Sequence, residues 1–171
     1  TLDDWCDAET EYETGNFGTP GAANDECPGV VDPNNCNDNG TARPIVPPVA
    51  GDVIITEIMA DSSNIGDEQG EWFEVYFAND ADLNGLQVGD AADATDTEIT
   101  SPDCIRVTGG SYVVFARTND NAVNGNLQAI AEFDFALNNG TESLIVSHNN
   151  VELDRVDGFD TTKGKALALD P

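Results

Sequence analysis

Oxygen-bearing side chains gather in two stretches of this 171-residue chain, the first of which reads DPNNCNDNGT. Carboxylate and amide oxygens at short spacing are the ligands that Ca²⁺ prefers, so we expect Ca²⁺ as a cofactor of these stretches. The first stretch is not an EF-hand loop, because it lacks the glutamate at the twelfth position. The alternative is that both stretches are solvated acidic loops. The candidate metal ligands are Asp32, Asn34, Asn37 and Asp38 in the first stretch and Asp61, Asp67, Glu68 and Glu71 in the second.

The four cysteines, Cys6, Cys27, Cys36 and Cys104, show no CxxC spacing of the kind that binds zinc. An even number of cysteines without such spacing predicts disulfides and an oxidising, extracellular compartment. Three pairings of four cysteines are possible. Cys27 and Cys36 can close a small local loop, which leaves Cys6 to bond Cys104. The alternative for this second pair is two buried free thiols.

Catalysis is not expected from the remaining reactive side chains. The single histidine, His148, lies in the sequence VSHNNVE, which is typical of a hairpin turn. No serine or cysteine has the sequence context of a nucleophile elbow. Pairs of carboxylates arise by number alone in a chain with 33 acidic residues. We therefore interpret the chain as a non-enzymatic protein.

The formal net charge of the chain is −27 at pH 7, with only six basic residues. Phosphates would be repelled, which excludes nucleic acids and anionic membrane surfaces as partners. No apolar run approaches the roughly 18 residues of a membrane helix, so we expect no membrane insertion. No signal-peptide pattern opens the chain, and we expect a mature, secreted protein. The acidity is also typical of a solvated surface from a salty habitat.

The elements that would position these residues fall into three segments. Residues 1–25 combine aromatic side chains with the sequence GTPGAAND, which favours an extended path along another surface. Residues 26–51 hold five prolines and several asparagines, and they predict an extended linker with a small disulfide loop. Residues 52–171 have the texture of a β domain.

Short apolar segments at a spacing of about 8–12 residues, separated by turn sequences, predict an all-β sandwich. Alternation in EWFEVYFA places Phe73, Val75 and Phe77 on one face of a strand and Trp72 and Tyr76 on the other. A change of phase in ELDRVDGF predicts a β-bulge near Asp154. The expected strands are Val53–Met59, Glu71–Ala78, Leu83–Asp90, Cys104–Val107, Ser111–Arg117, Ala129–Phe135, Glu142–His148 and Val151–Phe159.

The order of several motifs resembles a known family. The sequences GDVIITEIMAD, GEWFEVYFAND, LNGLQVGD, GGSYVVFAR and ESLIVSHNNVELDRVDGF together resemble the lamin-tail domain of secreted bacterial proteins, over residues 51–169. This resemblance implies an immunoglobulin-like β-sandwich. In bacterial members of the family, a segment similar to DDWC…GTPGAAN follows the last core strands and closes the domain. In this chain the corresponding segment comes first, at Thr1–Asp25.

The position of this closing segment leaves three interpretations. It can complete the chain's own sandwich, it can complete the sandwich of a neighbouring identical subunit, or it can belong to a window of a tandem array. We favour the second, in which the chain is the subunit of an extracellular filament that polymerises head to tail by N-terminal strand donation, with an intersubunit Cys6–Cys104 disulfide. The alternative is a self-completed, calcium-dependent adhesion or binding module. The expected interface residues are Trp5, Cys6, Tyr12, Phe17, Thr19, Pro20, Ala22 and Ala23.

Overall fold

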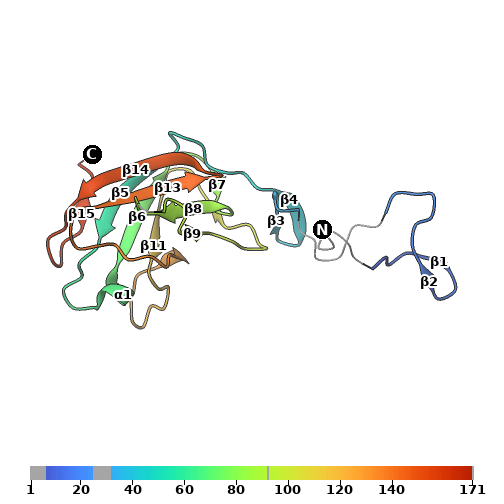
Figure 1. The fold of residues 1–171 in the computed structure, drawn as a ribbon, viewed down its shortest axis with the longest axis horizontal. Helices are drawn as coiled ribbons and strands as arrows, with labels where there is room; N and C mark the ends of the chain where they lie inside the picture. Colours follow the sequence, from blue (N-terminus) through green and yellow to red (C-terminus); the bar gives the residue numbers. More distant parts are fainter. Residues whose placement is uncertain (1–6, 25–31, 92, 171) are drawn as a thin grey trace.

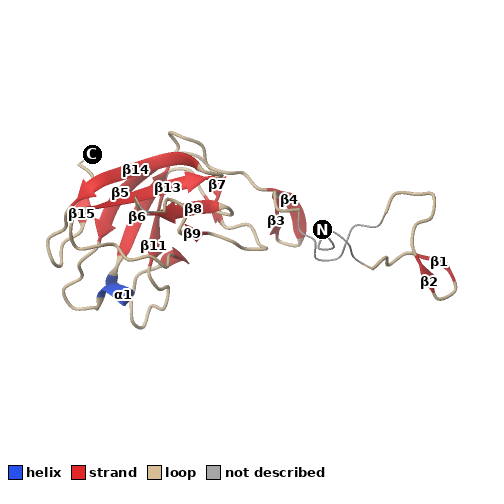
Figure 2. Cartoon of the chain, in the orientation of Figure 1, coloured by secondary structure: helices blue, strands red, loops and turns tan. Residues whose placement is uncertain are grey.

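The computed structural model describes residues 7–24, 32–91 and 93–170, and their regular structure is almost entirely β (Figures 1 and 2). One short helix, α1 (Asp67–Gly70), lies between β5 and β6. The strands are β1 (Glu11–Glu13), β2 (Asn16–Phe17), β3 (Asn35–Asp38), β4 (Thr41–Pro44), β5 (Val53–Met59), β6 (Trp72–Phe77), β7 (Ala81–Asp82), β8 (Leu86–Gly89), β9 (Thr97–Glu98), β10 (Arg106–Val107), β11 (Ser111–Ala116), β12 (Ala129–Glu132), β13 (Glu142–His148), β14 (Val151–Phe159) and β15 (Leu167–Ala168).

Two larger sheets form a sandwich, which confirms the predicted all-β class. The first sheet has five strands in the order β12-β11-β6-β5-β15, and the second has four strands in the order β14-β13-β8-β9. All neighbours in both sheets are antiparallel except β11 and β12, which are parallel. The pairs β1–β2, β3–β4 and β7–β10 form separate two-stranded sheets.

The core lies between the two larger sheets, because alternate side chains of each strand point toward the other sheet. On β6 the predicted inward residues Phe73, Val75 and Phe77 are fully buried, whereas Trp72 and Tyr76 are partly exposed. The ring of Phe73 stacks on Phe115 of β11 with a centroid distance of 5.0 Å. The second sheet contributes the fully buried side chains Leu86, Val88, Leu144 and Val146.

Three of the predicted strands have the expected bounds: β5, β13 and β14. The predicted bulge is also confirmed. In the β13–β14 pair, Val146 faces Asp154 and Ser147 faces Glu152, so Leu153 is the extra residue next to Asp154. This extra residue restores the phase of β14 and leaves Leu153 nearly buried.

A hairpin that the sequence analysis did not predict occupies part of the proline-rich stretch 26–51. Strands β3 and β4 pair antiparallel, with Asp38 opposite Thr41. The two residues between them, Asn39 and Gly40, have φ values of 54° and 91°. Positive φ at both positions is the requirement of a type I′ hairpin turn, for which Asn-Gly is the preferred sequence. The Asn-Gly turn signal is therefore present in NDNGT, alongside the oxygen-bearing side chains that suggest a cation site.

Candidate functional site

The N-terminal segment, residues 7–24, contains a small hairpin of its own. Strands β1 and β2 pair with Glu11 opposite Phe17. At the turn, Gly15 has a φ of 78°, and its backbone N–H donates to a side-chain oxygen of Glu11 at 2.6 Å. The backbone N–H of Gly18 donates to the carbonyl of Thr10 at 2.7 Å. These contacts shape the N-terminal segment locally but bury very little of its apolar surface.

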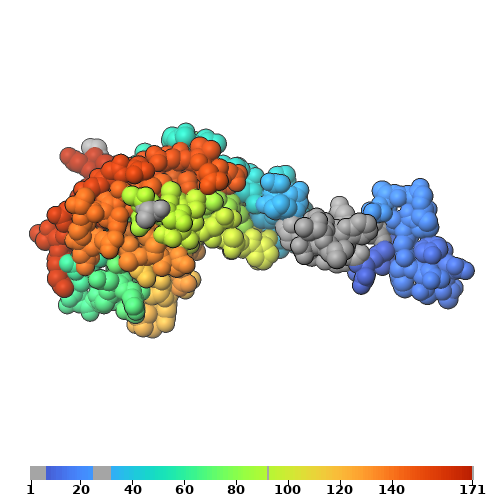
Figure 3. Space-filling view, viewed as in Figure 1, coloured from blue at the N-terminus to red at the C-terminus, as the bar shows by residue number. Residues whose placement is uncertain are grey.

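The aromatic side chains of the N-terminal segment are exposed. Tyr12 and Phe17 each retain 56% of their accessible surface. The segment lies apart from the sandwich, beyond the β3–β4 hairpin (Figures 1 and 3). Of the other predicted interface residues, Pro20, Ala22 and Ala23 are exposed and Thr19 is partly exposed. Trp5 and Cys6 lie outside the described residues.

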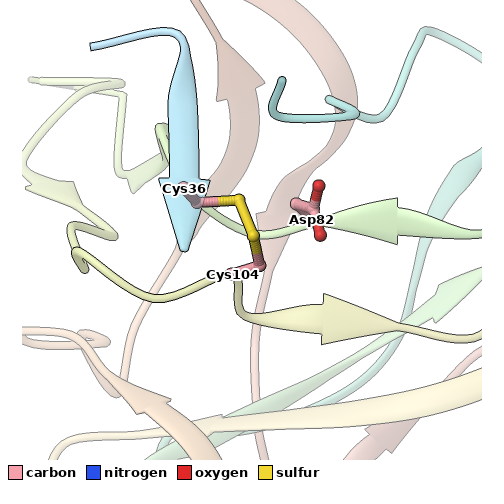
Figure 4. A group of neighbouring side chains, drawn as sticks. All are labelled: Cys36, Asp82 and Cys104. Atoms are coloured by element: carbon pink, nitrogen blue, oxygen red, sulfur yellow. A yellow bond between two sulfur atoms is a disulfide. The ribbon is translucent and has the colours of Figure 1, made fainter. Parts of the chain in front are cut away.

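A disulfide joins Cys36 of β3 to Cys104, with a Cα–Cα distance of 4.9 Å (Figure 4). The participation of both cysteines in a disulfide is confirmed, but the predicted pairing of Cys36 with Cys27 and of Cys104 with Cys6 is wrong. Proximity in sequence suggested Cys27, whereas the folded hairpin places Cys36 beside Cys104, 68 positions away. Cys6 and Cys27 themselves lie outside the described residues.

Backbone hydrogen bonds on both sides of this disulfide explain the pairing. The N–H of Asn37 donates to the carbonyl of Pro102 at 2.8 Å, and the N–H of Cys104 donates to the carbonyl of Asn37 at 3.0 Å. The side-chain amide of Asn37 also donates to Asp103 at 2.7 Å. The β3–β4 hairpin is thereby held against the loop that precedes β10.

Arg43 of β4 adds an ion pair to this attachment. Its two terminal nitrogens donate to the two carboxylate oxygens of Asp82 at 2.6 and 2.9 Å, and its Nε donates to Asp38 at 2.7 Å. The carboxylate of Asp82 is 1% exposed and also accepts the backbone N–H of Val46 at 2.8 Å. Two-point geometry of this kind makes an arginine–carboxylate pair stronger than a single contact.

Asp82→Asn is expected to lower the free energy of unfolding at pH 7 by about 2 kcal/mol, since charged hydrogen bonds to a buried acceptor are lost. Hydrogen bonding to Arg43 holds the pKa of Asp82 below its ordinary value. The contribution of a carboxyl with a lowered folded pKa is present above the unfolded pKa of about 3.9 and is lost as the pH falls through the folded pKa. Urea unfolding at pH 7 and at pH 3 should therefore show a smaller difference from wild type at pH 3.

The matched control for Asp82→Asn is Asp80→Asn. Asp80 also pairs with an arginine, Arg106, but both side chains are more than half exposed. We expect a much smaller loss in the control, because exposed ion pairs contribute little. An equal loss for Asp82→Asn at both pH values would contradict the assigned role of the Arg43–Asp82 pair.

Cys36, Cys104 and Asp82 place their ligand atoms within 4.8 Å of one another, which is a spacing compatible with a metal ion (Figure 4). The two sulfurs, however, are bonded to each other and offer no thiolate. Both carboxylate oxygens of Asp82 already accept hydrogen bonds from Arg43. This cluster therefore fastens the hairpin rather than presenting vacant ligands.

The candidate Ca²⁺ ligands of the first stretch contact protein groups. Asp32 accepts the backbone N–H and the side-chain amide of Asn34, both at 2.9 Å. Asn37 and Asp38 contribute to the attachment and the turn of the β3–β4 hairpin. In the part of the chain that the structure describes, no three acidic, histidine or cysteine side chains of this stretch converge on one point. The Ca²⁺ assignment stays a prediction.

The candidate ligands of the second stretch point in different directions. Asp61 lies 3.7 Å from the Lys163 ammonium, and Asp67 accepts the side-chain amide of Asn139 at 3.2 Å. Glu68 lines a shallow surface hollow with Arg117. Glu71 turns inward instead and is 1% exposed.

Glu71 connects three parts of the sandwich. A single carboxylate oxygen, Oε2, accepts two hydrogen bonds, one from the Arg117 side chain and one from the backbone N–H of Leu137, each at 3.0 Å. Burial raises the pKa of Glu71, and the contacts with Leu137 and Arg117 oppose that shift. The geometry makes Glu71 a buried structural carboxylate, and sequence reasoning had placed it among metal ligands because it follows Asp67 and Glu68.

A separate open cleft of about 480 Å³ lies between the β3–β4 hairpin and the turns at one end of the sandwich. His148 lies in its wall, at the end of β13, directly before the Asn149-Asn150 turn. Burial lowers the pKa of His148, and the nearby charge of Glu98 opposes that shift. His148 and Glu98 thus both line this cleft.

No family model, curated protein or solved structure matches this chain. Within the residues described, the structure contains no helix that is long and apolar enough to cross a membrane.

Proposed function

We propose that the chain is the structural subunit of an extracellular filament, in which the N-terminal segment of one subunit packs on the sandwich of the next. The observation that carries this proposal is the exposure of Tyr12 and Phe17 on a segment that lies apart from its own sandwich. The segment forms a β1–β2 hairpin rather than the expected extended path, and exposed aromatic side chains on such a separate hairpin favour a contact with another surface. An immunoglobulin-like, lamin-tail type of sandwich is part of the proposal.

The proposed contact is heterologous, because the donor segment and the acceptor sandwich are different surfaces. Such contacts propagate as open filaments unless the rotation closes a ring. The intersubunit disulfide that we expected through Cys104 is no part of the proposal, since Cys104 is bonded to Cys36 of its own chain. Burial of aromatic surface would then supply the association energy at this contact.

The net charge of −27 opposes the association of identical subunits. Divalent cations such as Ca²⁺, or high salt, would reduce this repulsion. We therefore include bound or condensed cations in the proposal and expect assembly to weaken in chelator at low ionic strength.

Replacing both exposed aromatics, Tyr12→Asp with Phe17→Asp, is expected to abolish assembly of the full chain. Two apolar contacts would be replaced by charges that repel the acidic neighbour, so polymers should give way to a species of 18.1 kDa. Light scattering after size-exclusion chromatography and negative-stain electron microscopy, with and without Ca²⁺, measure the change.

The matched control is Tyr112→Asp, which alters an aromatic on β11 of the sandwich that is 63% exposed and should leave assembly intact. Circular dichroism checks that each variant folds. A wild-type chain that stays monomeric at every concentration, with Ca²⁺ or high salt present, would refute the filament proposal.

The second candidate function is a monomeric, secreted binding module. The observation that favours it is the open cleft beside His148, with its volume of about 480 Å³ and its mixture of polar and apolar lining. Clefts of this size commonly hold small ligands. A monomeric wild-type chain in the assembly experiment would favour this candidate.

A further inference from the structure

The geometry points to the acceptor surface: we propose that the edge groove between β5, β15 and β14 receives residues 7–24 of a second copy of the chain. The edge groove is lined mainly by apolar residues, with Thr56 and two acidic residues, Glu57 and Asp170, also in its lining; the apolar residues are Ile55, Ile58, Val156, Leu167, Ala168 and Leu169. This inference rests on the proposed function, because it names the surface at which strand donation takes place.

The edge groove lies along one side of the sandwich, where the two sheets meet. Val156 comes from β14 of the four-stranded sheet, whereas Ile58 and Leu167 come from β5 and β15 of the five-stranded sheet. The backbone N–H of Ile55 donates to the Asp154 carboxylate at 2.7 Å, which ties the two sheets together beside the groove. The groove has a volume of about 250 Å³ and an almost entirely apolar lining. It can therefore accept apolar side chains from outside.

The two strands that border the edge groove differ in how they present their outer edges. On β14, the charged residues Glu152, Arg155 and Asp157 and two register shifts protect the edge against pairing with another strand. On β15 and just after it, Leu167 and Leu169 are 40% and 59% exposed. Exposed apolar side chains at a sheet edge favour β-strand addition, and they do so here on a strand of only two residues that lacks the charges of β14. The β15 side is thus the one prepared for pairing.

Charge complements the apolar contact. The only two lysines of the chain, Lys163 and Lys165, come directly before β15. The N-terminal segment carries acidic residues at positions 7, 9, 11 and 13 and no basic residue. Lys163 already lies 3.7 Å from Asp61, and Glu57 and Asp170 line the groove, so Lys165 is the cation that would face an acidic segment docked there.

The attachment of the β3–β4 hairpin favours a segment from a second copy over the chain's own. Seven residues, 25–31, lie between the N-terminal segment and Asp32, whose carbonyl accepts the N–H of Asn35 in β3 at 2.7 Å; these seven residues reach about 25 Å at full extension. Strand β14 runs from the cleft beside the hairpin to the edge groove. Asn149, directly before β14, lines the cleft and Val156 lines the groove, so the two sites lie about 20 Å apart along the strand. The chain's own segment would need an almost straight connection, which carries an entropic penalty, whereas a second copy meets no such restriction.

The test uses two full-length variants that are each deficient in one half of the contact. The donor variant carries Tyr12→Asp and Phe17→Asp, and the acceptor variant carries Leu167→Asp and Leu169→Asp. Each alone is expected to be monomeric, with association weakened more than about 100-fold. A 1:1 mixture contains one intact donor and one intact acceptor, so it should form a heterodimer of twice the 18.1 kDa chain mass and nothing longer.

The matched control replaces the acceptor substitutions by Val151→Asp, since Val151 on β14 is 59% exposed, as Leu169 is. This control should assemble like wild type. Sedimentation velocity measures the monomer, heterodimer and polymer in each sample. An acceptor variant that still polymerises, while the donor variant does not, would overturn the edge groove and leave the filament proposal standing. A wild-type chain that does not assemble would overturn the proposed function itself.

A charge-reversal substitution gives an independent test of the same contact through the affinity of the heterodimer. Lys165→Glu should weaken heterodimer formation about threefold to tenfold at low salt, and this difference should shrink as salt is added. Arg106→Glu makes the same change of charge away from the edge groove and should leave the affinity within about twofold. Equal effects of the two variants would contradict docking beside Lys165.

Discussion

Replacing Cys36 and Cys104 together by serine is expected to lower the free energy of unfolding by about 4 kcal/mol, from the loop-closure entropy that a bond across 68 positions removes from the unfolded chain. The loss is large because both cysteines belong to segments that the disulfide holds together at one end of the sandwich. Guanidinium unfolding at pH 7, followed by tryptophan fluorescence and circular dichroism, measures it. Non-reducing peptide mapping of the wild-type chain should recover the Cys36 and Cys104 peptides as one linked species.

The control for this prediction is Cys6→Ser with Cys27→Ser. The Cys36–Cys104 bond stays intact in that chain, so unfolding of the sandwich should match wild type. A control that is destabilised as strongly as the Cys36→Ser/Cys104→Ser chain would instead indicate that Cys36 and Cys104 are bonded to Cys6 and Cys27 rather than to each other.

Arg117→Met is expected to lower the free energy of unfolding at pH 7 by about 3 kcal/mol, because it leaves the carboxylate of Glu71 buried without its cation. The pKa of Glu71, already raised by burial, should rise further. For a carboxyl with a raised folded pKa, stability is fully present below the unfolded pKa of about 4.3 and is lost as the pH rises through the folded pKa. The deficit of the variant should therefore be largest near neutral pH and shrink toward pH 4, as measured by urea unfolding.

The double variant Glu71→Gln/Arg117→Met tests the cause. It removes the buried charge while an amide oxygen remains to accept the backbone N–H of Leu137, so it should recover part of the stability. Arg106→Met removes an exposed partner of Asp80 and should cause a much smaller loss. A pH-independent deficit in Arg117→Met would show that lost packing, rather than the buried carboxylate, is responsible.

Local patterns predicted the longer strands of the sandwich and the inward face of β6, whereas short strands such as β9 and β15 were not predicted. The alternation of Phe73, Val75 and Phe77 with Trp72 and Tyr76 predicted both the strand and its buried face, because side chains of a strand alternate with a period of two. The same reasoning predicted a bulge near Asp154, where the apolar pattern changes phase, and the structure makes Leu153 the extra residue. The Asn39-Gly40 sequence also predicts a hairpin turn, but the acidic and amide residues beside it led us to predict a cation site there instead.

Contacts between distant segments were decided by the tertiary structure alone. Cys36 bonds Cys104 rather than Cys27 because hydrogen bonds between Asn37 and the residues at 102–104 place the two sulfurs together. Glu71 faces inward because Arg117 and Leu137, far along the chain, provide its partners. The edge groove likewise exists only where β5, β14 and β15 meet. The sequence by itself determined which residues of a strand face inward and where turns form, because these properties depend on neighbouring residues. The partners of the cysteines, of the buried carboxylates and of the edge strands depend on which distant segments the fold brings together.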